Sequence, residues 1–169
     1  MTSQALITHT GFQFVVRAAG PADRAALEEF FGHVTPEDMR FRFLGSVKEV
    51  GDNRLVAMTD VDHERTESFV AAEREGGPVI ATAMLACDPE LTTGEVAVSI
   101  RADYKNRGIG WELLGFVTAL AEAKGVKRLQ SLESRANRAA IELERERGFV
   151  AKPFEGDSTL VVLEKVLSA

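Results

Sequence analysis

One stretch of the sequence decides the fold: Glu95-Val-Ala-Val-Ser-Ile-Arg-Ala-Asp-Tyr-Lys-Asn-Arg-Gly-Ile-Gly110. Its first part, within Gly94–Arg101, is rich in β-branched residues and predicts a strand. Its last residue begins the segment Gly110–Lys124, in which apolar residues recur at helical spacing and after which Gly125 can cap a helix. The stretch therefore predicts a strand, a short loop and a long helix in succession.

The loop between these two elements has the composition of an anion-binding turn. Gly108 and Gly110 let the backbone approach a ligand closely, and the first N–H groups of the following helix have no partner within it. Together they form a cradle that suits a pyrophosphate, and Lys105 and Arg107 add positive charge. On the glycines alone, a simple strand-to-helix turn without a ligand is the preferred interpretation.

The rest of the chain alternates between strand and helix patterns. Further strands are predicted at Phe12–Arg17, Glu67–Arg74, Val79–Cys87, Arg128–Glu133, Phe149–Pro153 and Thr159–Val166. Further helices are predicted at Ala22–His33, from Thr35 to about Leu44, at Asp52–Met58 and at Asn137–Arg147. This order indicates a mixed α/β fold with a central sheet and helices on both faces.

Composition and motifs exclude several classes of protein. The 169 residues carry a net charge of −6, which disfavours nucleic-acid binding, and the apolar runs are too short to span a membrane. Neither a GxxxxGK[ST] loop nor a GxGxxG fingerprint is present. Met1–Phe14 lacks the pattern of a signal peptide, and Cys87 is the only cysteine. We therefore expect one domain, residues 1–169, that acts in the cytoplasm.

Other polar clusters have simpler interpretations. His9, His33 and His63 have no spacing typical of metal ligands, so no metal site is expected, and Asp60–His63 is interpreted as an exposed acidic turn. The charges in Glu142–Arg147 alternate in sign, which is typical of a solvated helix face. Cys87 is expected to pack in the core.

Lys105-Asn-Arg-Gly108-Ile-Gly110 resembles motif A of the GNAT superfamily of acyl-CoA-dependent N-acetyltransferases, although its first position is usually Gln or Arg. A second block, from Asn137 to Gly148-Phe149, resembles the N-x-x-A helix and GF strand entry of that family. The opening Val16–Asp23 is also similar, so the resemblance covers nearly the whole chain. It implies a single GNAT-like domain with a mostly antiparallel, twisted sheet that is splayed in the middle.

Within the superfamily, the chain is most similar to the acetyltransferase domain of bacterial Pat-type protein lysine acetyltransferases. The segments that carry this likeness are Arg40–Leu44, Met58–Arg65 and Glu95–Val98. The resemblance implies acetyl-CoA as the co-substrate, with no metal. It also implies which residues contact the coenzyme: Ala97, Val98, Ser99 and Ile100 for the pantetheine and the thioester, Lys105, Asn106, Arg107, Gly108, Ile109, Gly110 and Trp111 for the pyrophosphate, and Asn137 for the pantetheine.

Glu95 is the candidate general base. It matches a glutamate of Pat-type domains, and strand alternation places it on one face with Ala97 and Ser99. A lysine-like amine with a pKa of ~10.4 is only about one part in a thousand free base at neutral pH, so a positioned base would help. The simpler interpretation is an exposed strand end. Many relatives use a tyrosine acid on the last helix, where this chain has Glu144, and Tyr104 is expected to support the loop instead.

Three functions follow in order of preference. The first is acetyl transfer to a protein lysine, the second is acetyl transfer to a small amine such as a polyamine, amino acid or antibiotic, and the third is a non-catalytic CoA-binding sensor. The resemblance places the acceptor near Phe30–Asp62, which carries no pattern that names it. No nucleic-acid or membrane partner is expected, and a homodimer is left open.

Overall fold

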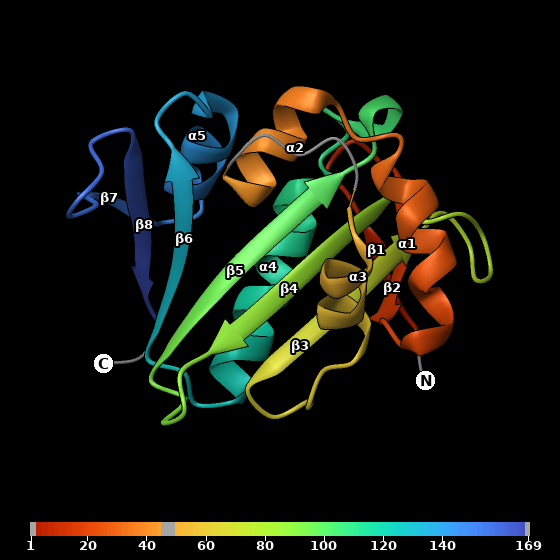
Figure 1. Ribbon diagram of the computed structural model, residues 1–169, viewed down its shortest axis with the longest axis horizontal. Helices are drawn as coiled ribbons and strands as arrows, with labels where there is room; N and C mark the ends of the chain where they lie inside the picture. The colour runs from red at the N-terminus through yellow and green to blue at the C-terminus, as the bar shows by residue number, and fades with distance from the viewer. Residues whose placement is uncertain (1–2, 45–49, 168–169) are drawn as a thin grey trace.

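The computed structural model describes residues 3–44 and 50–167. They form one eight-stranded sheet in the order β1-β2-β3-β4-β5-β6-β8-β7 (Figure 1). The strands are β1 (Gln4–Ile7), β2 (Gln13–Ala18), β3 (Thr66–Ala72), β4 (Ala81–Cys87), β5 (Thr93–Ile100), β6 (Arg128–Ser134), β7 (Val150–Pro153) and β8 (Leu160–Val166). All neighbouring strands are antiparallel except β5 and β6, which confirms the predicted mixed, mostly antiparallel α/β class.

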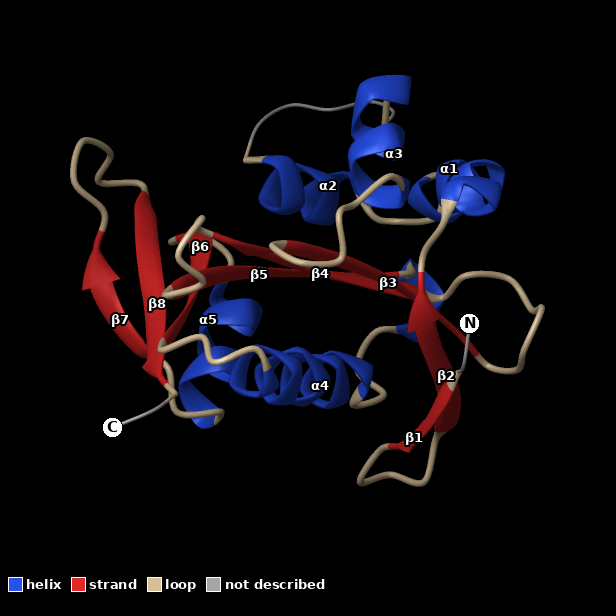
Figure 2. Cartoon of the chain, turned by 90° about the horizontal axis from the view of Figure 1, so that it is seen from below, coloured by secondary structure: helices blue, strands red, loops and turns tan. Residues whose placement is uncertain are grey.

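Five α-helices cover the two faces of the sheet. Their bounds are α1 (Arg24–Phe31), α2 (Pro36–Phe43), α3 (Asp52–Thr59), α4 (Ile109–Ala123) and α5 (Arg138–Glu146). Figure 2 shows α1, α2 and α3 on one face and α4 and α5 on the other. Two short 3-10 helices, Pro21–Asp23 and Ala102–Tyr104, precede α1 and α4.

The helix starts follow from their local sequences. Thr35 caps α2, because its side-chain oxygen accepts a hydrogen bond from the Asp38 N–H at 3.1 Å. Pro36 then takes the first position, where its missing N–H costs nothing. Gly108 stands immediately before α4 with φ at +88°, a left-handed conformation that favours glycine. These features fix the two helices that border the site described below.

β5 and β6 pair over a short distance and then separate. Their parallel register contains three residue pairs, from Thr93 with Arg128 to Glu95 with Gln130. β5 stays paired with β4 as far as Ile100, so only the edge that faces β6 opens. Figure 1 shows the two strands diverging from this point. We call this point the fork, and the predicted splay in the middle of the sheet is confirmed.

A buried core lies on each face of the sheet. The larger core packs α4 against the sheet and includes Leu113, Val117 and Leu129, all fully buried. The smaller core joins α1, α2 and α3 to the opposite face around Phe30. Cys87 is buried in the larger core as a free thiol, as predicted. Within the described ranges, no helix has the length and apolar content needed to cross a membrane.

The structure corrects several predicted boundaries. β1 was not predicted, because it has four residues, mostly exposed, and lacks a clear alternation of buried and exposed positions. The predicted helix Ala22–His33 is a 3-10 turn followed by α1, which ends at Phe31. The other predicted elements are present with ends shifted by a few residues. Residues 45–49, within the expected acceptor segment, lie outside the described residues.

Candidate functional site

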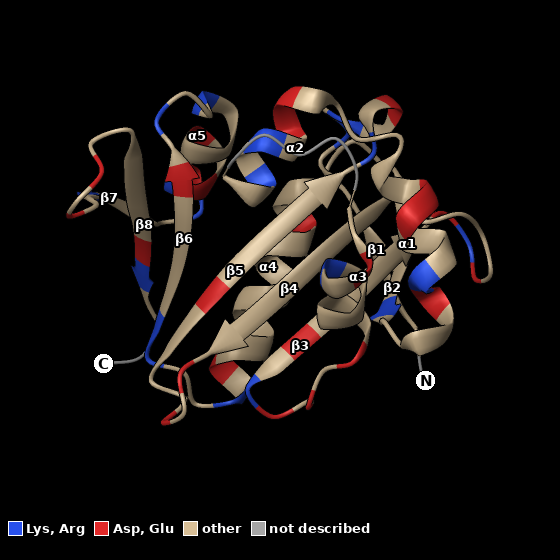
Figure 3. Cartoon of the chain, viewed as in Figure 1, with Lys and Arg blue, Asp and Glu red and all other residues tan. Residues whose placement is uncertain are grey.

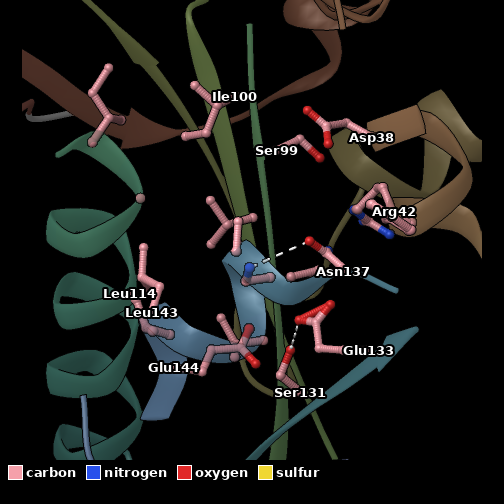
Figure 4. Close-up of a pocket in the computed structure, with 18 of the residues that line it drawn as sticks. Asp38, Arg42, Ser99, Ile100, Leu114, Ser131, Glu133, Asn137, Leu143 and Glu144 are labelled. Carbon is pink, nitrogen blue, oxygen red and sulfur yellow. Dashed lines mark hydrogen bonds between the residues drawn. The ribbon is translucent and has the colours of Figure 1, made fainter. Parts of the chain in front are cut away.

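A cavity of about 320 Å³ opens at the fork. It is lined by β5 and β6, by α2 from one face of the sheet, and by α4 and α5 from the other face. Figure 4 shows these elements surrounding a common space. This volume is within the range of small-molecule binding sites. The opening of the sheet therefore leaves a cavity that is large enough to hold a ligand.

The start of α4 forms one end of the cavity. Gly108, Ile109, Gly110 and Trp111 all line it, and the first N–H groups of a helix have no partner within that helix. A Cβ on Gly108 would lie 3.1 Å from the Thr8 Cβ, so the β1–β2 turn also requires this glycine. The backbone therefore presents the positive end of a 15-residue helix to the cavity, which fits a phosphate group.

The two basic residues of the loop differ in their roles. Lys105 lines the cavity, and its Nζ lies 2.7 Å from Asp38 Oδ2 on α2. Arg107 does not line the cavity, and is the one predicted coenzyme-binding residue that does not. Its guanidinium instead lies over the Tyr104 ring at 4.7 Å and the Phe12 ring at 5.4 Å. Of the two basic residues of the loop, only Lys105 therefore lines the cavity with the start of α4.

Trp111 and Tyr104 stabilise the loop on either side of the glycines. The Arg147 guanidinium lies 4.1 Å from the Trp111 ring and donates a hydrogen bond to the Trp111 carbonyl at 2.8 Å. The Tyr104 hydroxyl donates a hydrogen bond to Glu73, and its ring packs edge-on against Phe12. The expected supporting role of Tyr104 is consistent with these contacts.

Glu95 is the only charged residue of β5 and stands at the fork (Figure 3). Its side chain is exposed and lines the cavity. Ala97 and Ser99 follow on the same face of the strand, whereas Val98 and Ile100 pack toward the larger core. The Ser99 hydroxyl is buried without a hydrogen-bond partner among the described residues.

Asn137 caps α5 at the wall of the cavity. Its side-chain oxygen accepts a hydrogen bond from the Ala140 N–H at 3.4 Å (Figure 4). The resemblance assigned this residue to the pantetheine, and the structure places it beside the opened edge of β5. Eleven of the twelve predicted coenzyme-binding residues thus line one cavity together with Glu95: Ala97, Val98, Ser99, Ile100, Lys105, Asn106, Gly108, Ile109, Gly110, Trp111 and Asn137.

Two buried carboxyl groups in the cavity wall were not predicted. Glu133 on β6 and Glu144 on α5 are 8% and 7% exposed. Ser131 donates a hydrogen bond to Glu133 Oε2 at 2.8 Å, and Glu144 Oε1 has no partner among the described residues. Burial, followed by the neighbouring Glu133 carboxyl group, raises the pKa of Glu144 to about 10. The surroundings of Glu144 therefore favour its protonated, neutral form.

The interpretation of Glu142–Arg147 as a solvated helix face is wrong at Glu144. The alternation of charge concealed the helical period, which places Glu144 seven residues after Asn137 and thus on the same face. The seven-residue spacing between Asn137 and Glu144 could have identified Glu144 as a residue of the site.

Arg42 is the other side chain that the sequence did not identify. α2 carries it to the cavity, where it points toward the space beside Asn137 and Glu133 (Figure 4). Burial and the charge of Arg54 lower the pKa of Arg42, while the charges of Glu95 and Glu133 act in the opposite direction. Within residues 3–44 and 50–167, no group of three or more His, Cys, Asp or Glu side chains is arranged to hold a metal ion.

Comparisons with known proteins identify the family. The Acetyltransferase (GNAT) family profile matches residues 28–149. Acetyltransferase PA5475 of Pseudomonas aeruginosa is 30% identical over 154 residues, covering 90% of this chain and 83% of that protein.

Two solved structures have the same fold. The GNAT domain of S. lividans PAT superposes with a TM-score of 0.89 at 22% identity, over 98% of this chain and 97% of that chain. The yncA protein of Salmonella typhimurium, solved with its cofactor acetyl-CoA, gives a TM-score of 0.72 at 22% identity, over 92% of this chain and 94% of that chain. The chain therefore belongs to the acetyltransferase (GNAT) family.

Proposed function

We propose that this protein transfers the acetyl group of acetyl-CoA to a primary amine, the side chain of a protein lysine, with Glu95 as the general base. The observation that carries the proposal is the position of Glu95, which is the last residue of β5 paired with β6. A carboxylate at the fork lies where a thioester inserted between the strands would meet an amine. The similarity to Pat-type domains supports a lysine acceptor.

The coenzyme would occupy the cavity from α4 to the fork. The N–H groups at the start of α4, from Asn106 to Trp111, suit its pyrophosphate. The open edge of β5 beyond Glu95 offers unpaired backbone groups to the amides of the pantetheine, as in strand addition. Within this arrangement the N–H of Val98 is the donor we assign to the developing oxyanion.

The chemistry then needs one proton acceptor. The amine nitrogen attacks the thioester carbonyl carbon, the C–S bond breaks, and the coenzyme leaves as a thiolate. Glu95 accepts the proton that the amine gives up, directly or through water. An ordinary thiol has a pKa of ~8.5, so its thiolate is a tolerable leaving group without a dedicated acid. Tyr104, whose hydroxyl is engaged by Glu73, is not assigned that role.

The wider setting of the enzyme is also part of the proposal. One continuous sheet runs from Gln4 to Val166, which supports treating residues 1–169 as a single acetyltransferase domain. The buried free thiol of Cys87 agrees with a reducing compartment, and we place the enzyme in the cytoplasm.

The test is an acetylation assay with the full chain. Acetyl-CoA would be incubated with a set of purified proteins and with small amines, including polyamines and amino acids, and the products identified by mass spectrometry. Acetyl-lysine on proteins supports the proposal. Acetylation of small amines alone would replace the lysine acceptor with the second candidate. Tight binding of acetyl-CoA without transfer to any amine would leave a CoA-binding sensor.

A further inference from the structure

Arg42 is a cation in the cavity wall that has few hydrogen-bond partners among the described residues. It lies on α2, is half-buried, and lines the cavity. Among the described residues its one hydrogen bond is from Nη2 to the Met84 Sδ at 3.5 Å, and a thioether is a weak acceptor. Its guanidinium also lies 5.0 Å from the Phe43 ring. In the described part of the chain, no oxygen atom accepts a hydrogen bond from this guanidinium.

Another arginine of the same protein, Arg17, is paired with a carboxylate. The Arg17 guanidinium donates hydrogen bonds to both carboxylate oxygens of Asp23, at 2.7 and 2.8 Å, and one to a backbone carbonyl. The acidic residue one turn before Arg42 is Asp38, but its carboxylate lies 2.7 Å from Lys105 Nζ. Within residues 3–44 and 50–167, Arg42 thus lacks the carboxylate partner that a guanidinium normally takes when it is withdrawn from water.

Arg42 and the start of α4 lie on opposite faces of the sheet, and α2 contacts the loop before α4 through the ion pair of Asp38, one turn before Arg42, with Lys105. α2 covers one face and α4 covers the other (Figure 2), and Glu95 alternates with Val96, which is buried in the core under α4. Arg42 and Glu95 therefore approach the fork from the face opposite α4. A group bound by Arg42 would belong to the acceptor rather than to the coenzyme phosphates.

The charges around Arg42 restrict what this acceptor can be. Glu95 and Glu133 are the carboxylates whose charges act on Arg42, and all three line the cavity. A purely cationic amine would be attracted by the carboxylates and repelled by the guanidinium. An acceptor that carries both an amine and a carboxylate can place its amine near the carboxylates and its carboxylate near the guanidinium. The planar guanidinium can bind a carboxylate through two hydrogen bonds.

We propose that Arg42 binds a carboxylate of the acceptor and so directs its amine toward Glu95. This inference rests on the proposed acetyl transfer and names the chemical class of its substrate. The carboxylate has two sources, the α-carboxylate of a free amino acid or an Asp or Glu side chain next to a lysine on a protein. In both, Arg42 is a specificity-determining residue that contacts a part of the acceptor that does not react.

The experiment uses matched acceptors that differ in a carboxylate. One arm compares free amino acids with their carboxamides. The other compares blocked peptides that contain one lysine flanked by Glu or by Gln. The full chain, Arg42→Gln, Arg42→Lys and Arg40→Gln are assayed with acetyl-CoA, with rates corrected for the fraction of free amine. Arg40 is exposed on the same helix and does not line the cavity, so its variant controls for the loss of one charge.

We expect the wild type to prefer the carboxylate member of one arm by about 10-fold or more, the size of one charge-assisted hydrogen bond. Arg42→Gln should reduce this preference to about one, by raising KM for the carboxylate member, because the contact is equally strong before and during reaction. Arg42→Lys should recover part of it, and Arg40→Gln should retain it. The arm that shows the preference identifies the source of the carboxylate.

Three results would overturn the inference. They are equal rates on both members of every pair, equal losses in Arg42→Gln and Arg40→Gln, and a preference that follows a carboxylate on the acyl group, tested with succinyl-CoA. These leave the proposed function intact if acetyl transfer occurs. A wild-type protein that binds acetyl-CoA but acetylates no amine would reject the proposed function, and this inference with it.

Discussion

Glu133 and Glu144 place two carboxyl groups side by side in the cavity wall, and only Glu133 receives a hydrogen bond from Ser131. Burial and the neighbouring Glu133 carboxyl group raise the pKa of Glu144 to about 10. Two adjacent buried carboxylates would repel each other, so the native state keeps one proton on the pair. The stability of the fold is therefore linked to pH at this position.

The sign of that linkage can be measured. The folded state holds a proton on Glu144 that the unfolded chain releases near the ordinary pKa of 4.5, so its contribution to stability is complete below that value. It declines as the pH rises toward about 10, where the folded state also loses the proton. Urea unfolding from pH 5 to 10 should show wild type losing stability relative to Glu144→Gln, which has nothing to ionise there.

Glu142 provides the matched control for this series. It is exposed on the same helix, so Glu142→Gln should follow the wild-type pH curve. Parallel curves for wild type and Glu144→Gln would show that Glu144 is not held neutral by the fold.

Replacement of Glu95 tests the assigned base. Glu95→Gln preserves the shape of the side chain at the fork but cannot accept a proton. We expect kcat to fall by about 10²- to 10⁴-fold, the usual contribution of a general base, while the Kd for acetyl-CoA stays unchanged. Glu90→Gln, an exposed residue of the β4–β5 turn, should behave as wild type. Full turnover by Glu95→Gln at every pH would remove the assignment.

Gly108, just before α4, and Gly110, in the first turn of α4, should respond differently to the same change. Gly108→Ala forces a side chain into a backbone with φ at +88° and places its Cβ 3.1 Å from Thr8. We expect a loss of about 1–3 kcal/mol in the free energy of unfolding, together with weaker acetyl-CoA binding. Gly110→Ala meets only Leu143 at 3.6 Å and should keep the stability of the wild type.

Thermal unfolding and titration with acetyl-CoA would measure both effects. If Gly108→Ala were as stable as Gly110→Ala, the strained conformation at Gly108 would not be needed. If it were less stable but bound the coenzyme equally well, the cradle at the start of α4 would not hold the pyrophosphate.

Asp23 anchors the start of the first helical segment far from the cavity. Its carboxylate accepts hydrogen bonds from Arg17 and, at 2.8 Å, from the Gly20 N–H. The hydrogen bond from Arg17 lowers the pKa of Asp23, so its contribution is present above the ordinary value of 3.8 and disappears as the pH falls through the lowered value. Asp23→Ala should cost about 1–2 kcal/mol at pH 7.

Urea unfolding of Asp23→Ala and wild type at pH 7 and near pH 2 measures this contribution. The difference between the two proteins should shrink in acid. A difference of the same size at both pH values would mean that the carboxylate charge contributes nothing, and that the loss at pH 7 comes from packing.

The fold was largely predictable because its elements have local signals. Thr35-Pro36 begins α2, and Gly108 precedes α4, since capping and left-handed turns depend on a few adjacent residues. β1 had no such signal: it is short and mostly exposed, and it becomes a strand because β2 pairs with it. Tertiary pairing, rather than local preference, decides that element.

The residues of the site also divide into those that a local motif predicts and those that only the packing brings together. Glu95 and the glycine loop were found because they belong to one contiguous motif. Arg42 was missed because it lies more than fifty residues earlier, on a helix that crosses the opposite face of the sheet, and Glu133 and Glu144 come together from β6 and α5. Such encounters depend on how the elements pack. No property of α2 alone distinguishes Arg42 from its exposed neighbour Arg40.

The three-pair ladder at the fork also has a mechanical consequence. It is the only strand pairing, among the described residues, that joins the β1–β5 half of the molecule to the β6–β8 half. A ligand bound between β5 and β6 beyond the fork would extend this pairing by hydrogen-bonding to the backbone as a strand does. Amide protons along the open edge of β5 should then exchange rapidly with deuterated solvent in the free enzyme and slowly in the complex, so the substrate itself completes the sheet.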